Sequence, residues 1–220
     1  FAGKYRLKVI EDAAQAIGIH YRGKHAGTFG DAGCFSFFAD KTITTGEGGF
    51  IATNNESIYR KLLYLRNQGR LDRGTFIHPE IGYNFRMTDM QCAVGLAQLE
   101  KFETIKKLKN EILKSYQKGL SSVKEVRFFT PENEADYIPF RVGILCQRAH
   151  ELMEYLKTKD IEPRTFFYPL HWQPCYKKMK AVGPKDSGLL RSSWQLADKK
   201  GKKKKNDSDF PNAIYGYEHG

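Results

Sequence analysis

Residues 36–49 read SFFADKTITTGEGG, a stretch that places one lysine, Lys41, in an apolar turn punctuated by glycines. Upstream, residues 9–16 read VIEDAAQA, so that Asp12 stands 29 positions before Lys41, where an apolar run at residues 7–10 ends. Short apolar runs that end in polar residues are typical of buried strands. Open α/β sheets bind ligands at the carboxyl ends of their strands. The sequence therefore predicts a site where this strand ends.

The pairing of Lys41 with Asp12 is what pyridoxal phosphate chemistry requires. A lysine amine forms a Schiff base with the cofactor aldehyde, and an acid keeps the pyridine nitrogen protonated, so that the ring acts as an electron sink. Spacing alone does not establish this, because the chain has 36 Lys and Arg residues and most of them must be solvated. Taken alone, Asp12 could also be a loop residue that caps a helix.

Three stretches taken together are more specific. They read VIEDAAQA at residues 9–16, GDAGCFSFFADKTITTGEGGF at 30–50 and GYNFRMTDMQCAVGLAQLE at 82–100. In this order they resemble the DegT/DnrJ/StrS family of sugar aminotransferases, and PRTFFYPLHWQPCY at 163–176 is similar to the perosamine-forming branch of that family. The resemblance implies the α/β fold class, with a partial fold-type-I transferase that depends on pyridoxal 5′-phosphate.

The resemblance assigns cofactor contacts by position. Lys41 matches the Schiff-base lysine, and Asp12 matches the acid that pairs with the pyridine nitrogen. Gln15 matches a residue that approaches the cofactor ring and its hydroxyl, and Ser36 matches the hydroxyl that binds the phosphate. A branch of the family that removes a hydroxyl without transferring nitrogen carries histidine at the lysine position, so Lys41 favours transamination.

Three further residues are candidates. Asn84 matches a family asparagine that contacts the phosphate of the partner subunit's cofactor. The resemblance therefore implies a homodimer with shared sites. Helix capping is the alternative for Asn84. Arg86 is a candidate ligand for a substrate carboxylate or phosphate, with the same alternative. His171 could contact the nucleotide sugar or be a structural histidine.

The expected organisation follows the resemblance. Residues 1–120 would be the second half of the large cofactor-binding domain with its long connecting helix, and 121–182 a small α+β domain. Residues 183–208 would be a Lys-rich insertion and 209–220 a resumed, truncated piece of the small domain. The family's N-terminal half and extreme C-terminus would be missing.

The expected strands and helices follow from local sequence patterns. Strands are predicted at residues 34–38, 49–53, 126–129, 137–145 and 165–168, and helices after Asn54 or Asn55 and over 148–158. Thr88 and Gln91 form a capping box that predicts the start of one long helix.

The formal net charge of +11 is concentrated in one segment. Residues 176–205 hold 11 Lys and Arg against 2 Asp and Glu, a net +9, which leaves +2 for the rest of the chain. A nucleic-acid-binding domain would spread positive charge along a folded face, whereas a run of like charges repels itself and buries little apolar area. We therefore expect a disordered insertion, no nucleic-acid partner and, since no apolar run could span a bilayer, no membrane partner.

The four cysteines show no CxxC pair and no histidine at metal-ligand spacing, so no metal site is expected. An enzyme-like chain with four unpaired cysteines and no signal sequence is typical of the cytoplasm, where thiols stay reduced.

The resulting hypothesis is a pyridoxal 5′-phosphate-dependent aminotransferase for glycan biosynthesis. Its expected partners are a nucleotide-linked 4-keto-6-deoxy sugar, glutamate as amino-acid donor, and a second copy of the chain. Two alternatives stay open: an inactive fragment that serves as a dimerising or scaffolding module, and an electrostatic anion binder that acts through the Lys run.

Overall fold

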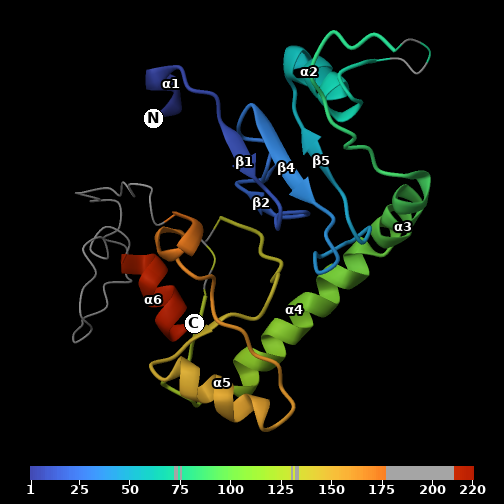
Figure 1. Ribbon diagram of the computed structural model, residues 1–220. Helices are drawn as coiled ribbons and strands as arrows, with labels where there is room; N and C mark the ends of the chain where they lie inside the picture. The colour runs from blue at the N-terminus through green and yellow to red at the C-terminus, as the bar shows by residue number, and fades with distance from the viewer. Residues whose placement is uncertain (72–73, 75, 130, 132–133, 177–210) are drawn as a thin grey trace. The chain divides into compact units, whose positions relative to one another are not determined.

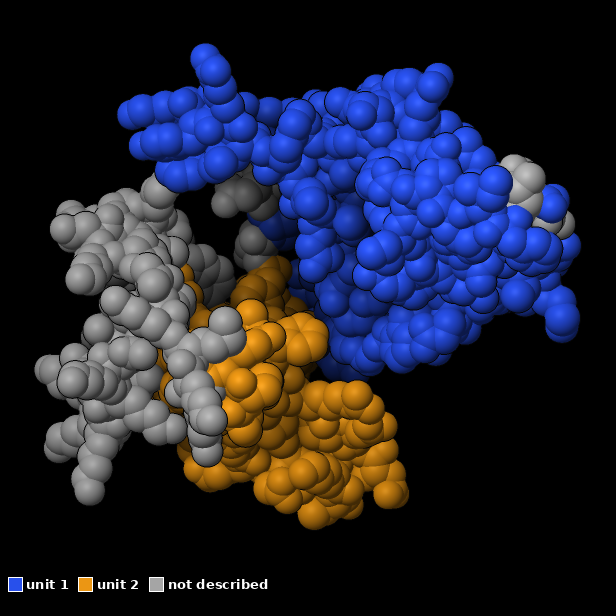
Figure 2. All heavy atoms as spheres, turned by 45° about the horizontal axis from the view of Figure 1, so that its top comes forward, with its two compact units in different colours: residues 1–118, 130–142 blue, residues 119–129, 143–220 orange. Residues whose placement is uncertain are grey.

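The computed structural model describes residues 1–71, 74, 76–129, 131, 134–176 and 211–220 (Figure 1). The Lys-rich insertion expected at residues 183–208 lies outside them. The chain divides into two compact units, which Figure 2 colours separately. Unit 1 comprises Phe1–Lys118 and Thr130–Val142, and unit 2 comprises Gly119–Phe129 and Gly143–Gly220. Residues 134–142 thus belong to unit 1, whereas the sequence analysis placed them in the small domain. No helix among the described residues is long and apolar enough to cross a membrane.

A three-stranded sheet lies at the centre of unit 1. Strand β1 (Ile10–Asp12) runs parallel to β4 (Ala32–Ser36), which pairs antiparallel with β5 (Gly49–Ala52). The buried Phe35 stacks on Phe50 across the β4–β5 pair, with ring centroids 4.4 Å apart. The predicted strands at 34–38 and 49–53 are therefore confirmed, with slightly different ends.

The first predicted strand lies later than expected and is not buried. Residues 7–9 are not part of β1, and Ile10 is 71% exposed. The physical reason is that β1 is an edge strand of the described sheet, paired with β4 alone, so its apolar side chains lack a covering element in the described part of the chain.

A hairpin and a distant segment complete unit 1. Strand β2 (His20–Tyr21) pairs with β3 (Lys24–His25), and Tyr21 forms an isolated antiparallel bridge with Ala135. We call residues 134–142 the return segment. After the bridge at Ala135 it contains Ile138, which is only 2% exposed. A strand had been predicted over 137–145, but only its last two residues form one. The carbonyls of Pro139 and Phe140 accept from the Lys109 side chain instead of a strand, and Pro139 has no N–H to give to a ladder.

Helix α1 spans Ala2–Tyr5, and α2 spans Glu56–Arg66. The side chain of Asn55 caps α2 by accepting the Ile58 N–H at 3.1 Å, as the sequence predicted. The predicted capping box at Thr88 and Gln91 is confirmed and begins α3 (Asp89–Glu100).

The single long helix predicted after Thr88 is two helices, α3 and α4 (Phe102–Gly119), as Figure 1 shows. The break lies at Lys101, whose ψ of 4° departs from helical geometry and whose N–H bonds to Gln98. The break coincides with close packing of Phe102 on Gly18. Gly18 has φ +75°, and a Cβ there would lie 2.2 Å from the Phe102 ring.

Unit 2 is small and mixed. Strands β6 (Arg127–Phe128) and β7 (Ile144–Leu145) pair antiparallel, followed by α5 (Ala149–Lys157), the 3₁₀ turns η1 (Leu170–Trp172) and η2 (Pro174–Tyr176), and α6 (Pro211–His219). The strand predicted at 165–168 is wrong. Phe166 packs through its ring, 4.9 Å from that of Phe129 and against Gly220, rather than through a backbone ladder.

Candidate active site

Asp12 and Ser36 end the two parallel strands of unit 1. Asp12 pairs in register with Cys34, and the next residue, Ala13, donates its N–H to the Cys34 carbonyl at 2.9 Å. Because β1 and β4 are parallel, their carboxyl ends lie at one edge of the sheet, where α/β folds bind ligands. The exposed Asp12 accepts the Ala14 N–H through Oδ1 at 3.1 Å. Residues 13–19 form turns and no helix, so the helix cap considered as an alternative is not observed, and the contact with Ala14 engages one carboxylate oxygen in a turn.

Two more of the predicted residues lie near this edge in sequence. Ser36 is the last residue of β4, and Gln15 follows the end of β1 by three residues. The half-buried Ser36 accepts the Phe38 N–H through Oγ at 3.2 Å, which leaves its hydroxyl proton for another acceptor. Gln15 is exposed in the turn that the Ala16 N–H closes on the Ala13 carbonyl at 2.9 Å. The Ser36 hydroxyl is therefore available to a ligand at this edge, and the role of Gln15 stays a prediction.

Lys41 lies in a turn that binds back onto the end of β4. Its N–H donates to the Phe38 carbonyl at 3.0 Å, while the Phe37 carbonyl accepts both the Thr45 N–H and the Thr44 hydroxyl, each at 3.0 Å. Ile43 is 3% exposed, so the turn is fixed from its apolar side. The Lys41 side chain is half-buried and leaves from this fixed turn.

The return segment contacts this turn. The Lys41 ammonium lies 4.8 Å from the centroid of the Phe140 ring, and Asp40 pairs with Arg141 at 2.7 Å. Lys109 of α4 donates to the Phe140 and Pro139 carbonyls at 3.3 and 3.4 Å. Desolvation and the nearby Arg141 charge lower the pKa of Lys109, while Asp40 acts the other way. Sequence reasoning missed these residues, because no motif joins positions 101 residues apart, as Asp40 and Arg141 are.

Glu11, beside Asp12, is a second residue that sequence reasoning missed. Its carboxylate accepts the Gly30 N–H at 2.6 Å and the Gly27 N–H at 2.7 Å. Desolvation acts to raise the pKa of Glu11, but these hydrogen bonds, one from Phe29 and the Lys24 charge outweigh it and hold the pKa below its ordinary value. Glu11 thus anchors the loop between β3 and β4. An acid followed by a glycine-rich loop was the signal available in the sequence.

Asn84 and Arg86 form a second cluster within unit 1. Arg86 Nε donates to Asn84 Oδ1 at 3.3 Å, and the Asn84 backbone bridges to Asn67 after α2. Both residues line an open hollow of about 640 Å³, together with Arg70, Met87, Thr88 and Asp89. The alternative that Asn84 caps a helix is not observed, because Thr88 caps α3. An arginine beside a helix N-terminus suits an anion.

His171 lies in unit 2, in the turn η1, where its half-buried ring is 5.7 Å from that of Trp172. The role of His171 at a substrate stays a prediction. Among the described residues no cluster of three His, Cys, Asp or Glu side chains could hold a metal ion.

Residues 1–198 match the model of the DegT/DnrJ/EryC1/StrS aminotransferase family. The chain belongs to this family. GDP-perosamine synthase of Escherichia coli O157:H7 is 42% identical over 175 residues, which cover 78% of this chain and 48% of that protein. Its counterpart of Vibrio cholerae is 39% identical over 181 residues, covering 80% and 49%. Helicobacter pylori PseC, an aminotransferase of pseudoaminic acid biosynthesis, superposes with a TM-score of 0.77 at 27% identity, covering 86% of this chain and 53% of that one.

The chain thus spans about half the length of the curated relatives it matches. The predicted fold class, part of an α/β fold-type-I transferase, is confirmed. Pyridoxal 5′-phosphate, the expected cofactor, is confirmed for the family, whose solved sugar aminotransferases match this chain. The residues present fit this group: the ends of two adjacent strands carry an exposed carboxylate and a hydroxyl with a free proton, and the turn after the second strand carries a lysine amine.

Proposed function

We propose that the protein to which this chain belongs transfers an amino group to a nucleotide-linked 4-keto-6-deoxy sugar. Glutamate would be the amino donor, and the product would enter glycan biosynthesis. The observation that carries the proposal is that Asp12 and Ser36 end the parallel strands β1 and β4, and that the turn with Lys41 follows β4 and hydrogen-bonds back to Phe37 and Phe38. The similarity to GDP-perosamine synthases supports the choice of sugar.

Each residue has a definite task in this proposal. Asp12 would hold the pyridine nitrogen protonated, and the Ser36 hydroxyl would donate to the phosphate. When bound, the cofactor supplies an electron sink for the carbon that loses its proton. Lys41 would hold the cofactor at rest, and its free amine would then move the proton between the reacting carbon of the cofactor and C4 of the sugar.

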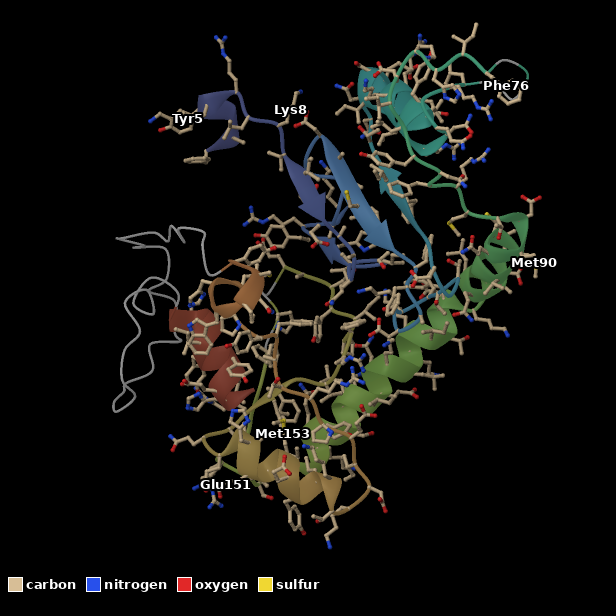
Figure 3. All side chains as sticks on the ribbon, viewed as in Figure 1. Tyr5, Lys8, Phe76, Met90, Glu151 and Met153 are labelled. Atoms are coloured by element: carbon tan, nitrogen blue, oxygen red, sulfur yellow. The ribbon has the colours of Figure 1, made fainter. Side chains whose placement is uncertain are left out.

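We also propose that the complete enzyme is a homodimer in which Asn84 acts on the partner's cofactor. Large apolar side chains surround the Asn84 cluster in the sequence and are solvent-exposed: Ile81 is 87%, Phe85 73% and Met90 82% exposed. Figure 3 labels Met90 on α3 and Phe76 in the loop after α2, with both side chains projecting from the ribbon. Exposed apolar surface of this extent favours a protein partner.

The decisive experiment maps the cofactor-bound lysine. The full-length enzyme is incubated with pyridoxal 5′-phosphate, reduced with borohydride and digested, and the modified peptide is identified by mass spectrometry. We expect the modification on Lys41, and Lys41→Ala should lose both the modification and turnover. Lys114→Ala, at an exposed position of α4, is the matched control and should keep both. A modification on any other lysine contradicts the proposal.

The two alternatives are tested more simply. An inactive dimerising module would form dimers without binding the cofactor, which absorbance spectroscopy detects. Anion binding through the Lys run, whose residues lie outside the described part of the chain, would show a steep dependence on salt.

A further inference from the structure

The ring of Phe140 makes cation–π contacts with two side chains. The Lys41 ammonium lies 4.8 Å and the Arg141 guanidinium carbon 5.2 Å from the ring centroid. Cations within about 6 Å of an aromatic centroid are attracted by its quadrupole, and the attraction grows as the pair is removed from water. Phe140 and Lys41 are both half-buried. The Lys41 amine therefore has a specific resting place against this ring.

The position of the ring is itself fixed from three directions. Lys109 donates to the carbonyls of Phe140 and Pro139, and Arg141 pairs with Asp40 next to Lys41. On the preceding side Ile138 is 2% exposed, close to Gly18. Since neighbours on both sides of Phe140 are held, the ring cannot move away from the Lys41 turn without breaking several contacts.

We propose that Phe140 is a positioning residue for Lys41, whose ring holds the amine in place whenever the amine is not bonded to the cofactor. The inference rests on the proposed function of Lys41. A free lysine side chain samples many rotamers, and proton transfer requires the amine within hydrogen-bond reach of the reacting carbon. A ring that restricts the amine keeps it near that position between the steps in which it is used.

The first test uses the full-length protein without cofactor. Trace acetylation by acetic anhydride is followed by mass spectrometry of the Lys41 peptide. Phe140→Leu should raise the acetylation rate of Lys41 about 2- to 10-fold, the range expected for the loss of one cation–π contact. Phe140→Tyr keeps a ring and should acetylate like the wild type.

A matched control is available on the β3–β4 loop. Lys24 lies 4.9 Å from the ring of Phe29, a contact of nearly the same length far along the chain from Phe140. Phe29→Leu should raise the acetylation of Lys24 and leave Lys41 unchanged. An unchanged Lys41 rate in folded Phe140→Leu, or equal rates in Phe140→Leu and Phe140→Tyr, overturns the inference.

The second test needs no variant, so misfolding of Phe140→Leu cannot defeat it. Lysines of the cofactor-free protein are reductively methylated with ¹³C-formaldehyde. The ring current of Phe140 should shift the Lys41 methyl resonance upfield from that of exposed Lys114. A Lys41 resonance at the position of the exposed lysines overturns the inference.

A third measurement separates this inference from the proposed function. In the cofactor-loaded enzyme, Phe140→Leu should lower kcat with little change in KM, and Phe140→Tyr should restore kcat. Suppose that borohydride fixes the cofactor on Lys41, but the acetylation rate of Lys41 and kcat are the same in wild type and Phe140→Leu. The positioning role then fails and the proposed function stands. If the cofactor is fixed elsewhere, the proposed function fails, whatever the acetylation shows.

Discussion

Glu11 accepts the backbone N–H of Gly27 at 2.7 Å, so the acid next to Asp12 fixes the loop before β4 rather than facing the ligand edge. Side chains alternate along a strand, which turns neighbouring residues of β1 to opposite faces. The lowered pKa of Glu11 reflects the same hydrogen bonds.

Glu11→Gln should therefore destabilise the protein in a pH-dependent way. Because the folded pKa lies below the ordinary 4.5, the stabilisation is present above pH 4.5 and is lost as the pH falls through the folded value. At pH 7 we expect the free energy of unfolding to fall by about 1 kcal/mol. Urea unfolding at pH 3 to 7 measures this, with exposed Glu100→Gln as control. A difference between wild type and variant that does not shrink on acidification contradicts the assignment.

Asp12→Asn should separate the two readings of Asp12. Asparagine caps a turn as well as aspartate does, so the contact to Ala14 and the fold should survive. The amide cannot serve as an ionic partner for a protonated pyridine nitrogen, so turnover should fall by several orders of magnitude with part of the cofactor still bound. Steady-state kinetics and cofactor absorbance measure the two effects. Near-normal turnover would mean that Asp12 only fixes the turn at Ala14.

If Asn84 acts on the cofactor of the partner subunit, two inactive variants should complement each other in a mixed dimer. Full-length Lys41→Ala and Asn84→Ala proteins should each be impaired, and their mixture should regain activity, because each heterodimer carries one intact site of two. Subunit exchange is confirmed by mass spectrometry of differently tagged chains. Exchange without recovered activity would remove the in-trans role, whereas the Lys41 assignment would be unaffected.

Thr88→Ala should weaken the start of α3. The variant loses the side-chain acceptor for the Gln91 N–H, which costs about 0.5–2 kcal/mol. Thr88 lines the same hollow as Asn84 and Arg86, so cofactor affinity of the full-length enzyme should fall as well. Urea unfolding and cofactor titration measure the two effects, with Ser115→Ala on α4 as control. Unchanged stability would show that the capping box contributes nothing there.

The sequence predicted those features whose cause is local. The caps at Asn55 and Thr88 and the two strands around the Lys41 turn depend on neighbouring residues, and they are found as expected. The return segment could not be predicted, because its partners are distant in the chain and follow no periodicity. Residues 137–143 read as strand by composition, yet the Lys109 side chain binds the carbonyls of Pro139 and Phe140. The roles of Asp12, Gln15, Ser36, Lys41, Asn84, Arg86 and His171 stay predictions.

The discontinuity of unit 1 has a consequence for biosynthesis. A ribosome that has made the chain as far as Lys118 has delivered the sheet, the hairpin and the Lys41 turn, but not Ile138 or Phe140. Domains generally fold as units during synthesis. Unit 1 is therefore completed only after eleven residues of unit 2, Gly119–Phe129, have emerged. Nascent chains that stall in this interval would leave Gly18 and Phe102 without their neighbour Ile138, and a chain cut at residue 120 should be captured by chaperones more than one that reaches residue 142.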